Sequence, residues 1–227
     1  MLRYTLCIMI GLLFSDPVLF IVMLLAIVLA LSFHEFSHAF AGHIQGDETA
    51  ERMGRLTMNP FAHIDWIGLA LLVVVGFGWG KPVPFNPHNL KNKKFGPLLV
   101  SLAGPTSNLL LALVSAGAYR ALDAYTLINP SNALMVFLML SVIFNLALML
   151  FNLLPIPPLD GSRVLTTILD GSKYANFRYR LETQGVWILL FVILLDSIFE
   201  IGIFSGLFSI VSHLGCNVLL SGSACVF

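Results

Sequence analysis

The sequence predicts an all-α polytopic membrane protein with about four to six transmembrane helices and a short re-entrant segment or hairpin. Of its 227 residues, 58% are hydrophobic and 11% are charged, whereas a soluble domain carries about 25% charged residues. The mean hydropathy is +0.90. The apolar residues also fall in long runs that short polar segments separate. We therefore expect one integral-membrane domain over residues 1–227, with its core at about 17–185.

The N-terminal third contains two apolar runs of different length. Leu2–Phe14 is short for a transmembrane span and suits a half-span or an interfacial helix. Pro17–Ile44 is long enough to cross a bilayer, and Glu35 is its one charged residue. A polar stretch, residues 46–65, follows it. The second run is therefore the best candidate for a functional transmembrane helix.

Trp66–Gly80 is apolar but too short for a comfortable crossing, and glycine recurs at its end. This pattern favours a re-entrant segment or hairpin. Three further apolar runs are long enough for spans: Gly96–Tyr119, Asn132–Leu154 and Gln184–Val211, the last interrupted by Asp196 and Glu200. Asn108 and Asn145 lie within two of these runs, where we expect hydrogen bonds between helices.

The Pro17–Ile44 run contains a His-Glu-x-x-His pattern at residues 34–38. Residues four apart share one helix face, so His34 and His38 can present two imidazoles to one metal ion. Glu35 lies beside them, where it can accept a proton from a water molecule that the metal activates. Ionisable groups inside an apolar span are costly and therefore indicate function, and a bound cation would account for this cluster.

The Lys and Arg residues predict the orientation of this helix. If Trp66–Gly80 does not cross, the segments 46–65, 81–95 and 155–183 share one side and hold all of the 12 Lys and Arg residues except Arg3 and Arg120. Positively charged loops face the cytosol. His34 then lies about ten residues inside the cytosolic face, roughly 15 Å deep at 1.5 Å per residue.

Two histidines leave a catalytic zinc ion short of its usual third protein ligand. Glu48, Glu51 and His63 are candidates that follow the helix. Asp160 is a better one, because it follows a span on the same side and a proline-broken segment that can carry it back toward the histidines. Its alternative role is the N-cap of a helix that begins at Gly161.

At this point the sequence resembles the site-2 protease family of zinc intramembrane metalloproteases, in its small prokaryotic branch without a PDZ or CBS domain. The resemblance covers about residues 17–185 and is carried by His34-Glu35-x-x-His38, Asn152-x-x-Pro155-x-x-x-x-Asp160-Gly161, Gly54-Arg55-Leu-Thr-Met-Asn-Pro-x-x-His63-Ile-Asp65, Gly80-Lys-Pro-Val-Pro and Ala103-Gly104-Pro105-x-x-Asn108.

The resemblance implies one zinc ion per chain, held by His34, His38 and Asp160. It also implies that Glu35 is the general base and that Asn152 steadies the substrate or the oxyanion. The expected reaction is hydrolysis of peptide bonds in or near transmembrane segments. The expected partners are a transmembrane protein or peptide substrate, the lipid bilayer and, beyond those, a second copy or an adaptor protein. The expected location is the cell membrane, crossed several times, with the site toward the cytosol.

Two other functions stay open. One is a membrane zinc protease whose site lies outside the bilayer and uses a glutamate such as Glu51 as third ligand. The other is an ion-transporting or scaffold membrane protein, because intramembrane histidines and carboxylates also mark ion pathways. A formal net charge of +0 gives no sign of nucleic-acid binding.

Overall fold

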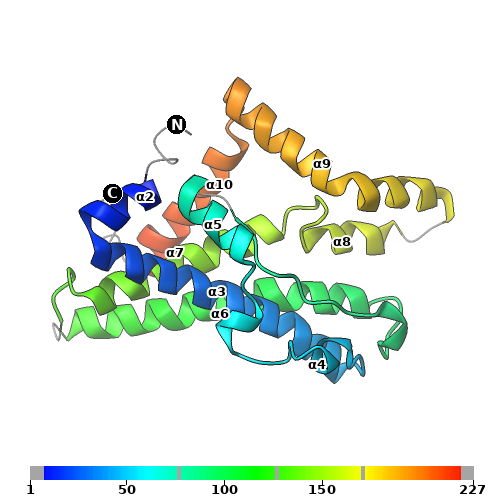
Figure 1. Cartoon of the computed structure of the whole chain (residues 1–227), viewed down its shortest axis with the longest axis horizontal. Coiled ribbons are helices and arrows are strands. Elements are labelled where there is room, and N and C mark those ends of the chain that lie inside the picture. The colour runs from blue at the N-terminus through cyan, green and yellow to red at the C-terminus, as the bar shows by residue number, and fades with distance from the viewer. Residues whose placement is uncertain (1–7, 76–77, 126–127, 170–171, 221–227) are drawn as a thin grey trace.

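The computed structural model describes residues 8–75, 78–125, 128–169 and 172–220, and within these ranges every regular element is helical (Figure 1). The elements are α2 (Ile8–Ser15), α3 (Pro17–Ile44), α4 (Thr49–Arg52), η1 (Pro60–Ala62), α5 (Trp66–Val75), η2 (Pro87–Asn89), α6 (Gly96–Ala124), α7 (Ala133–Asn152), α8 (Gly161–Ile168), η3 (Ser172–Tyr174), α9 (Ala175–Phe199), α10 (Ile203–Ser212) and η4 (His213–Leu219).

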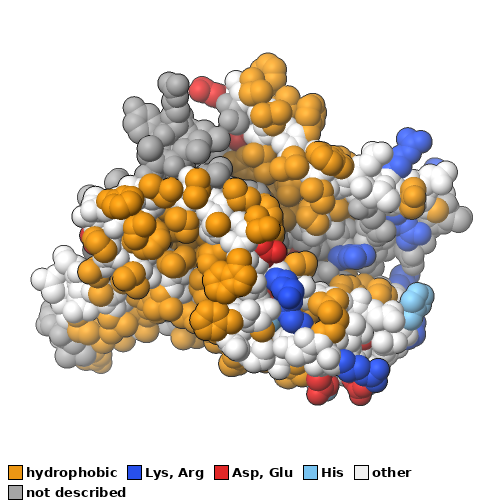
Figure 2. All heavy atoms as spheres, in the orientation of Figure 1, with side chains coloured by type: hydrophobic (Ala, Val, Ile, Leu, Met, Phe, Trp, Pro, Cys, Tyr) orange, Lys and Arg blue, Asp and Glu red, His pale blue; other side chains and the backbone are white. Residues whose placement is uncertain are grey.

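Three long helices, α3, α6 and α7, pack side by side and form the centre of the molecule (Figure 1). Each is long and apolar enough to cross a membrane, and two shorter apolar helical segments, Thr183–Asp196 and Ile203–Leu219, accompany them in the described part of the chain. Hydrophobic side chains cover much of the visible surface over these helices (Figure 2). The protein is therefore an all-helical membrane protein, as its composition predicts.

The bounds of the long helices agree with the apolar runs. Helix α3 has the predicted limits, because Asp16 caps its start by accepting a hydrogen bond from the Leu19 N–H at 3.0 Å. Helix α6 continues five residues beyond Tyr119, since most of the residues that follow are good helix formers and Leu122 packs against the core. Of the predicted Leu2–Phe14 segment, residues 2–7 lie outside the described residues.

Helices α6 and α7 share the hydrophobic core with the C-terminal helices. The buried residues of this core are Ala112, Ala116, Tyr119, Met135, Val142, Ile143, Leu146, Val211, Cys216 and Leu220. Several of those on α6 are small, which lets the two helix backbones approach closely. This packing fixes α6 and α7 as a frame against which α3 lies.

The segment Trp66–Gly80 forms a hairpin, as its length and glycine content predict. Helix α5 is 10 residues long, and the chain then returns so that Trp79 passes Gly68. A Cβ on Gly68 would lie 2.1 Å from the Trp79 carbonyl oxygen, so only glycine permits this approach. The return places the polar segments 46–65 and 81–95 at the same end of the molecule, where the Lys91 N–H donates to the Gln45 carbonyl at 2.8 Å.

The last apolar run divides into two helices. Helix α9 projects away from the three central helices (Figure 1) and ends at Phe199, with Glu200 as its C-cap. Glu200 and Gly202 have positive φ angles of 49° and 90°, which reverse the chain before α10. The Asp196 carboxylate accepts hydrogen bonds from the N–H groups of Ile203 and Phe204 at 2.7 and 3.2 Å. The predicted interruption by Asp196 and Glu200 is therefore a turn between helices.

Candidate metal centre

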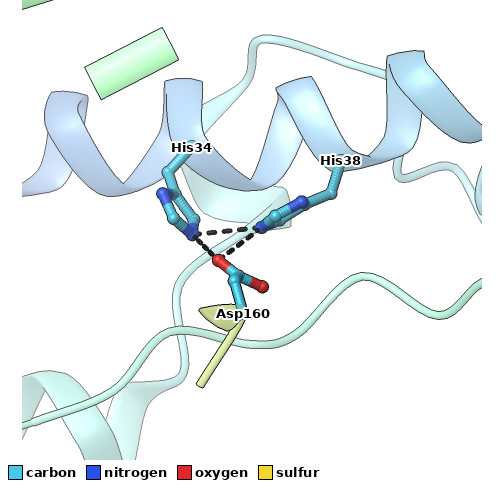
Figure 3. Close-up of side chains that lie close together, drawn as sticks. All are labelled: His34, His38 and Asp160. Atoms are coloured by element: carbon cyan, nitrogen blue, oxygen red, sulfur yellow. Dashed lines mark hydrogen bonds and ion pairs between the residues drawn. The ribbon is translucent and has the colours of Figure 1, made fainter. Parts of the chain in front are cut away.

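His34 and His38 lie one turn apart on the buried face of α3. Their Nε2 atoms are 3.1 Å apart and point into the same space between α3 and the segment that follows α7 (Figure 3). The apolar run therefore folds into a helix that turns its two imidazoles inward, away from the surrounding lipid.

Asp160 reaches these histidines from more than a hundred residues away. Its Oδ2 atom lies 3.1 Å from His34 Nε2 and 3.3 Å from His38 Nε2 (Figure 3). Asp160 occupies the N-cap position of α8, but its side chain makes no capping hydrogen bond. Asp160 therefore holds the N-cap position without capping the helix, and its carboxylate faces the histidines instead.

Two glycines make room for this arrangement. A Cβ on Gly104 of α6 would lie 2.5 Å from His38 Nε2 and 2.7 Å from His34 Cε1. A Cβ on Gly161 would lie 2.2 Å from the Leu153 carbonyl oxygen, so glycine lets the start of α8 press against the end of α7. The first glycine admits the imidazoles and the second positions Asp160.

Hydrogen bonds to the other ring nitrogens orient both imidazoles. His34 Nδ1 lies 2.6 Å from Asn108 Oδ1, and His38 Nδ1 lies 2.8 Å from the Val100 carbonyl oxygen. Both partners are acceptors, so each Nδ1 carries the proton and each Nε2 keeps its lone pair. Asn108 also donates to Asn145 Oδ1 at 2.8 Å, which ties α6 to α7 as the sequence predicts.

The three ligand atoms fit a tetrahedral zinc ion. Two imidazole nitrogens and a carboxylate oxygen are the donor set of many catalytic zinc sites. Ligands at 2.0–2.1 Å in a tetrahedron lie about 3.3 Å from one another, and the three separations here are 3.1, 3.1 and 3.3 Å. Asp160 Oδ2 is buried and has no hydrogen-bond partner among the described residues. Lone pairs that face one another at such distances repel, and a cation among them offsets that repulsion.

Glu35 lies next to this centre and is held by the segment that follows the hairpin. The Val83 N–H donates to Glu35 Oε2 at 3.0 Å. Two residues earlier, the Lys81 N–H donates to the His63 carbonyl at 2.9 Å, and Arg55 Nη2 donates to the Lys81 carbonyl. The motif predicts Glu35 but not the backbone donor that fixes it, because Val83 carries no polar side chain.

Arg55 is a buried cation close to this carboxylate. Burial lowers the pKa of Arg55, and the attraction of the Glu35 carboxylate offsets part of that effect. Its Nε atom has no partner among the described residues. Arg55 therefore donates a hydrogen bond to the Lys81 carbonyl and attracts the Glu35 carboxylate. The sequence shows Arg55 only as a motif residue, without this role.

The other candidate ligands lie elsewhere. Glu51 pairs with His43 at 2.9 Å, and Glu48 pairs with Arg52 at 2.8 Å. His63 is buried, and its Nε2 lies 2.7 Å from the Thr57 carbonyl oxygen, where it orders the loop. Among the described residues, His34, His38 and Asp160 form the one group whose ligand atoms all lie within 4.8 Å of one another.

Asn152 lies at the C-terminal end of α7, half-buried. Its Nδ2 donates to the Leu148 carbonyl of the same helix at 3.0 Å. Among the described residues, this is the hydrogen bond that the Asn152 side chain makes. The predicted catalytic role therefore requires the second hydrogen on Nδ2 to bind the substrate or the oxyanion.

Sequence comparisons relate the chain to zinc metalloproteases by family and by name. The profile of Peptidase family M50 matches residues 124–195, which include Asn152 and Asp160. "Putative zinc metalloprotease YwhC" of Bacillus subtilis (strain 168) is 38% identical over 180 residues, which are 77% of this chain and 82% of that protein. "Putative zinc metalloprotease Rip2" of Mycolicibacterium smegmatis is 34% identical over 159 residues, 66% of this chain and 58% of that protein.

The chain thus spans most of YwhC but little more than half of the Rip2 protein. No solved structure matches it. The extent of the match to YwhC establishes the family, and the helices long enough to cross a membrane indicate a membrane protein. The chain belongs to peptidase family M50, the site-2 protease family, and is a zinc metalloprotease of the membrane.

Proposed function

We propose that this protein is an intramembrane metalloendopeptidase that hydrolyses peptide bonds in or near transmembrane segments of membrane proteins. The observation that supports this most strongly is the position of two of the three ligand atoms on α3, a helix long and apolar enough to span a bilayer, with the Asp160 carboxylate beside them. His34 lies about ten residues from the C-terminal end of this helix, roughly 15 Å along it. A site at that depth reaches substrates within the membrane.

In this proposal His34, His38 and Asp160 hold one zinc ion. Zinc supplies Lewis-acid chemistry, which polarises the substrate carbonyl and lowers the pKa of a water molecule toward neutrality. Asn108 and Val100 keep each Nε2 directed at the ion by accepting the Nδ1 protons. The side chain of Asp160 is 18% exposed, which leaves an approach for water to the centre.

Glu35 acts as the general base. It adjoins His34 on α3, and its Oε2 accepts from the Val83 N–H, which orients the carboxylate and leaves Oε1 for the water proton. The carboxyl then returns that proton to the leaving amine of the cleaved peptide bond. The positive charge of the nearby Arg55 attracts the Glu35 carboxylate.

Asn152 stabilises the substrate or the developing oxyanion. An amide nitrogen carries two hydrogens, and one of them engages the Leu148 carbonyl. The second is the donor that we assign to the substrate, and one such preorganised donor contributes about 3–4 kcal/mol to transition-state stabilisation.

The substrate is a transmembrane protein or peptide. A transmembrane helix satisfies its own backbone groups, so the substrate must unwind locally before its carbonyl reaches the site. We place the protein in the cell membrane as a multi-pass protein, with the centre toward the cytosol, because the basic segments 46–65, 81–95 and 155–183 flank the centre. A second copy or an adaptor protein is a further candidate partner.

The alternative of a site outside the bilayer has less support. It requires a glutamate such as Glu51 as third ligand, and Glu51 instead pairs with His43 beyond the end of α3. An ion pathway or a scaffold would not need a carboxylate that a backbone N–H orients beside the ligands. Both alternatives therefore fit the geometry worse than peptide hydrolysis.

The experiment compares wild type, Glu35→Gln and Glu51→Gln in detergent, with single-span membrane peptides as substrates. We expect Glu35→Gln to retain zinc and to lose cleavage by about 10²–10⁴-fold, which is the usual contribution of a general base. Glu51→Gln, which removes the same charge, keeps both. Loss of zinc in Glu51→Gln would instead favour the site outside the bilayer.

A further inference from the structure

A hollow lies where the segment before α6 meets α8 and the start of α9. Its volume is about 360 Å³. Its polar lining consists mainly of Lys93, Lys94, Arg163, Thr166, Thr167 and Arg178. Figure 2 shows Lys and Arg side chains gathered at this end of the molecule. We call this hollow the basic pocket.

The basic pocket concentrates positive charge. Four of its lining side chains are cationic, and none of the described residues that line it is acidic. Cationic side chains attract an anion that enters the space they line, and the hydroxyl groups of Thr166 and Thr167 line the same space. The pocket therefore suits an anionic group that hydroxyl and cationic donors can surround, such as a phosphate.

Exposed apolar side chains lie on the same elements as the residues that line the basic pocket. Phe95, Ile168 and Phe177 each adjoin a lining residue in sequence, and they are 47%, 75% and 50% exposed. Pro97, which also lines the pocket, belongs to the first turn of α6, one of the helices able to span a membrane. A ligand here meets cations beside exposed apolar surface at the end of a membrane helix, which is the chemistry of a phospholipid.

Arg163 connects the basic pocket to the catalytic residues. Its guanidinium lies 5.8 Å from the centre of the Phe85 ring, two residues after Val83, whose N–H holds Glu35. Its backbone N–H donates to the Asp160 carbonyl at 3.0 Å. A ligand that draws on Arg163 therefore acts on the two segments that position Glu35 and Asp160.

We propose that the basic pocket binds the phosphate headgroup of an anionic phospholipid and so secures α8 against α6 beside the metal centre. Helices α6 and α8 pack together at this point. Basic pockets at the cytoplasmic ends of membrane helices recognise such headgroups, with about 1 kcal/mol, or about fivefold in affinity, for each cationic side chain.

The test measures lipid binding to the full-length, zinc-loaded chain by native mass spectrometry in a neutral detergent. Phosphatidylglycerol and phosphatidylcholine are added in turn to wild type, Lys94→Gln and Arg178→Gln. The controls are Lys173→Gln and Arg180→Gln, which remove the same charge from exposed residues that do not line the pocket. We expect phosphatidylglycerol to bind wild type preferentially, and each pocket variant to bind it about fivefold more weakly.

Equal losses in the pocket variants and the controls would overturn the proposal, because they would indicate general attraction to a basic surface. Competition by millimolar inorganic phosphate as effective as that by the lipid would also overturn it, since the pocket would then hold a soluble anion. Equal binding of both lipids to wild type would exclude recognition of the headgroup charge.

A second readout rests on the proposed protease function. In vesicles, phosphatidylglycerol should raise cleavage by wild type severalfold over pure phosphatidylcholine, and Lys94→Gln should lose this response while it keeps zinc. The binding measurement is repeated with Glu35→Gln, which needs no activity. Selective lipid binding without any cleavage by wild type would contradict the proposed function alone, and cleavage without selective binding would contradict the lipid site alone.

Discussion

Asn108 determines which nitrogen of His34 faces the metal centre. Its Oδ1 accepts the Nδ1 proton at 2.6 Å, and its own amide is held by Asn145 Oδ1 and by the Ala30 carbonyl at 3.2 Å. Asn108→Ala removes the acceptor, so the His34 ring is free to rotate or change tautomer. We expect zinc affinity to fall by about 10–100-fold, as for other residues that orient a metal ligand.

Competition with a chelator of known affinity measures this change. Thr106→Ala is the matched control, because Thr106 lies on the same helix, is exposed and donates to the Leu102 carbonyl of that helix. An unchanged zinc affinity in Asn108→Ala would show that Asn108 serves helix packing alone.

Gly104 supplies a second prediction for single residues. Gly104→Ala would place a methyl group 2.5 Å from His38 Nε2, so one imidazole must leave the centre. Gly117→Ala is the matched control, since it lies on the same helix with nothing within 4 Å of the added carbon. We expect Gly104→Ala to lose most of its bound zinc and Gly117→Ala to retain it, measured as zinc per chain by mass spectrometry. Full zinc occupancy in Gly104→Ala would contradict the arrangement of the two rings.

At the scale of the elements, Asp47 joins the end of α3 to the segment before α6. Burial disfavours its charge, but hydrogen bonds from Thr49, Asn86 and Asn89 outweigh this and lower the pKa of Asp47. A lowered pKa stabilises the fold above the unfolded value of about 3.9, and this stabilisation is lost as the pH falls through the folded value. The contribution of Asp47 is therefore complete at neutral pH.

Asp47→Asn should lower the melting temperature at pH 7 by about 3–6 °C. One charged hydrogen bond contributes about 1.5 kcal/mol to the free energy of unfolding, and each kcal/mol shifts the melting temperature by about 2–4 °C. The difference between the variant and wild type should stay constant down to about pH 5 and shrink below about pH 4. Thermal unfolding in detergent across this range measures it. A difference that grows toward acid pH would contradict the lowered pKa.

Arg55 holds the segment that fixes Glu35. Arg55→Gln removes the donor to the Lys81 carbonyl and the positive charge near Glu35, while the three candidate ligands stay intact. We expect a loss of about tenfold or more in kcat with zinc content unchanged. Arg52→Gln is the control, because Arg52 is exposed and its pair with Glu48 is of the kind that contributes about 0–1 kcal/mol. Equal activity in both variants would remove Arg55 from the positioning of Glu35.

At the scale of the whole molecule, most of the fold is predicted by two features of the sequence: the lengths of the apolar runs and the spacing of the motif residues. The limits of α3 follow from Asp16, Pro17 and an apolar run, which are local features. The short, glycine-rich run at Trp66–Gly80 predicts the hairpin, because a crossing needs more residues. The sequence predicts Asp160 as a ligand because the span before it ends on the same side of the membrane as the helix with the histidines. In the structure its carboxylate lies beside them.

Contacts between distant segments could not be predicted from the sequence, because local patterns do not encode them. The bond from the Val83 N–H to Glu35 depends on the path of the chain after the hairpin, and any residue except proline could make it. The packing of Arg55 under the Lys81 carbonyl and the gathering of Lys94 and Arg178 around one pocket join segments far apart in sequence. Such tertiary contacts appear only when the helices are placed together.

Zinc content in wild type and Asp160→Ala tests the central claim most directly. Both proteins are purified without added metal, their folding is compared by circular dichroism, and zinc per chain is measured by mass spectrometry. The account predicts about one zinc ion per wild-type chain and little in Asp160→Ala, because two imidazoles alone complete no catalytic zinc site. Equal zinc in a folded Asp160→Ala protein would contradict it and place the third ligand elsewhere.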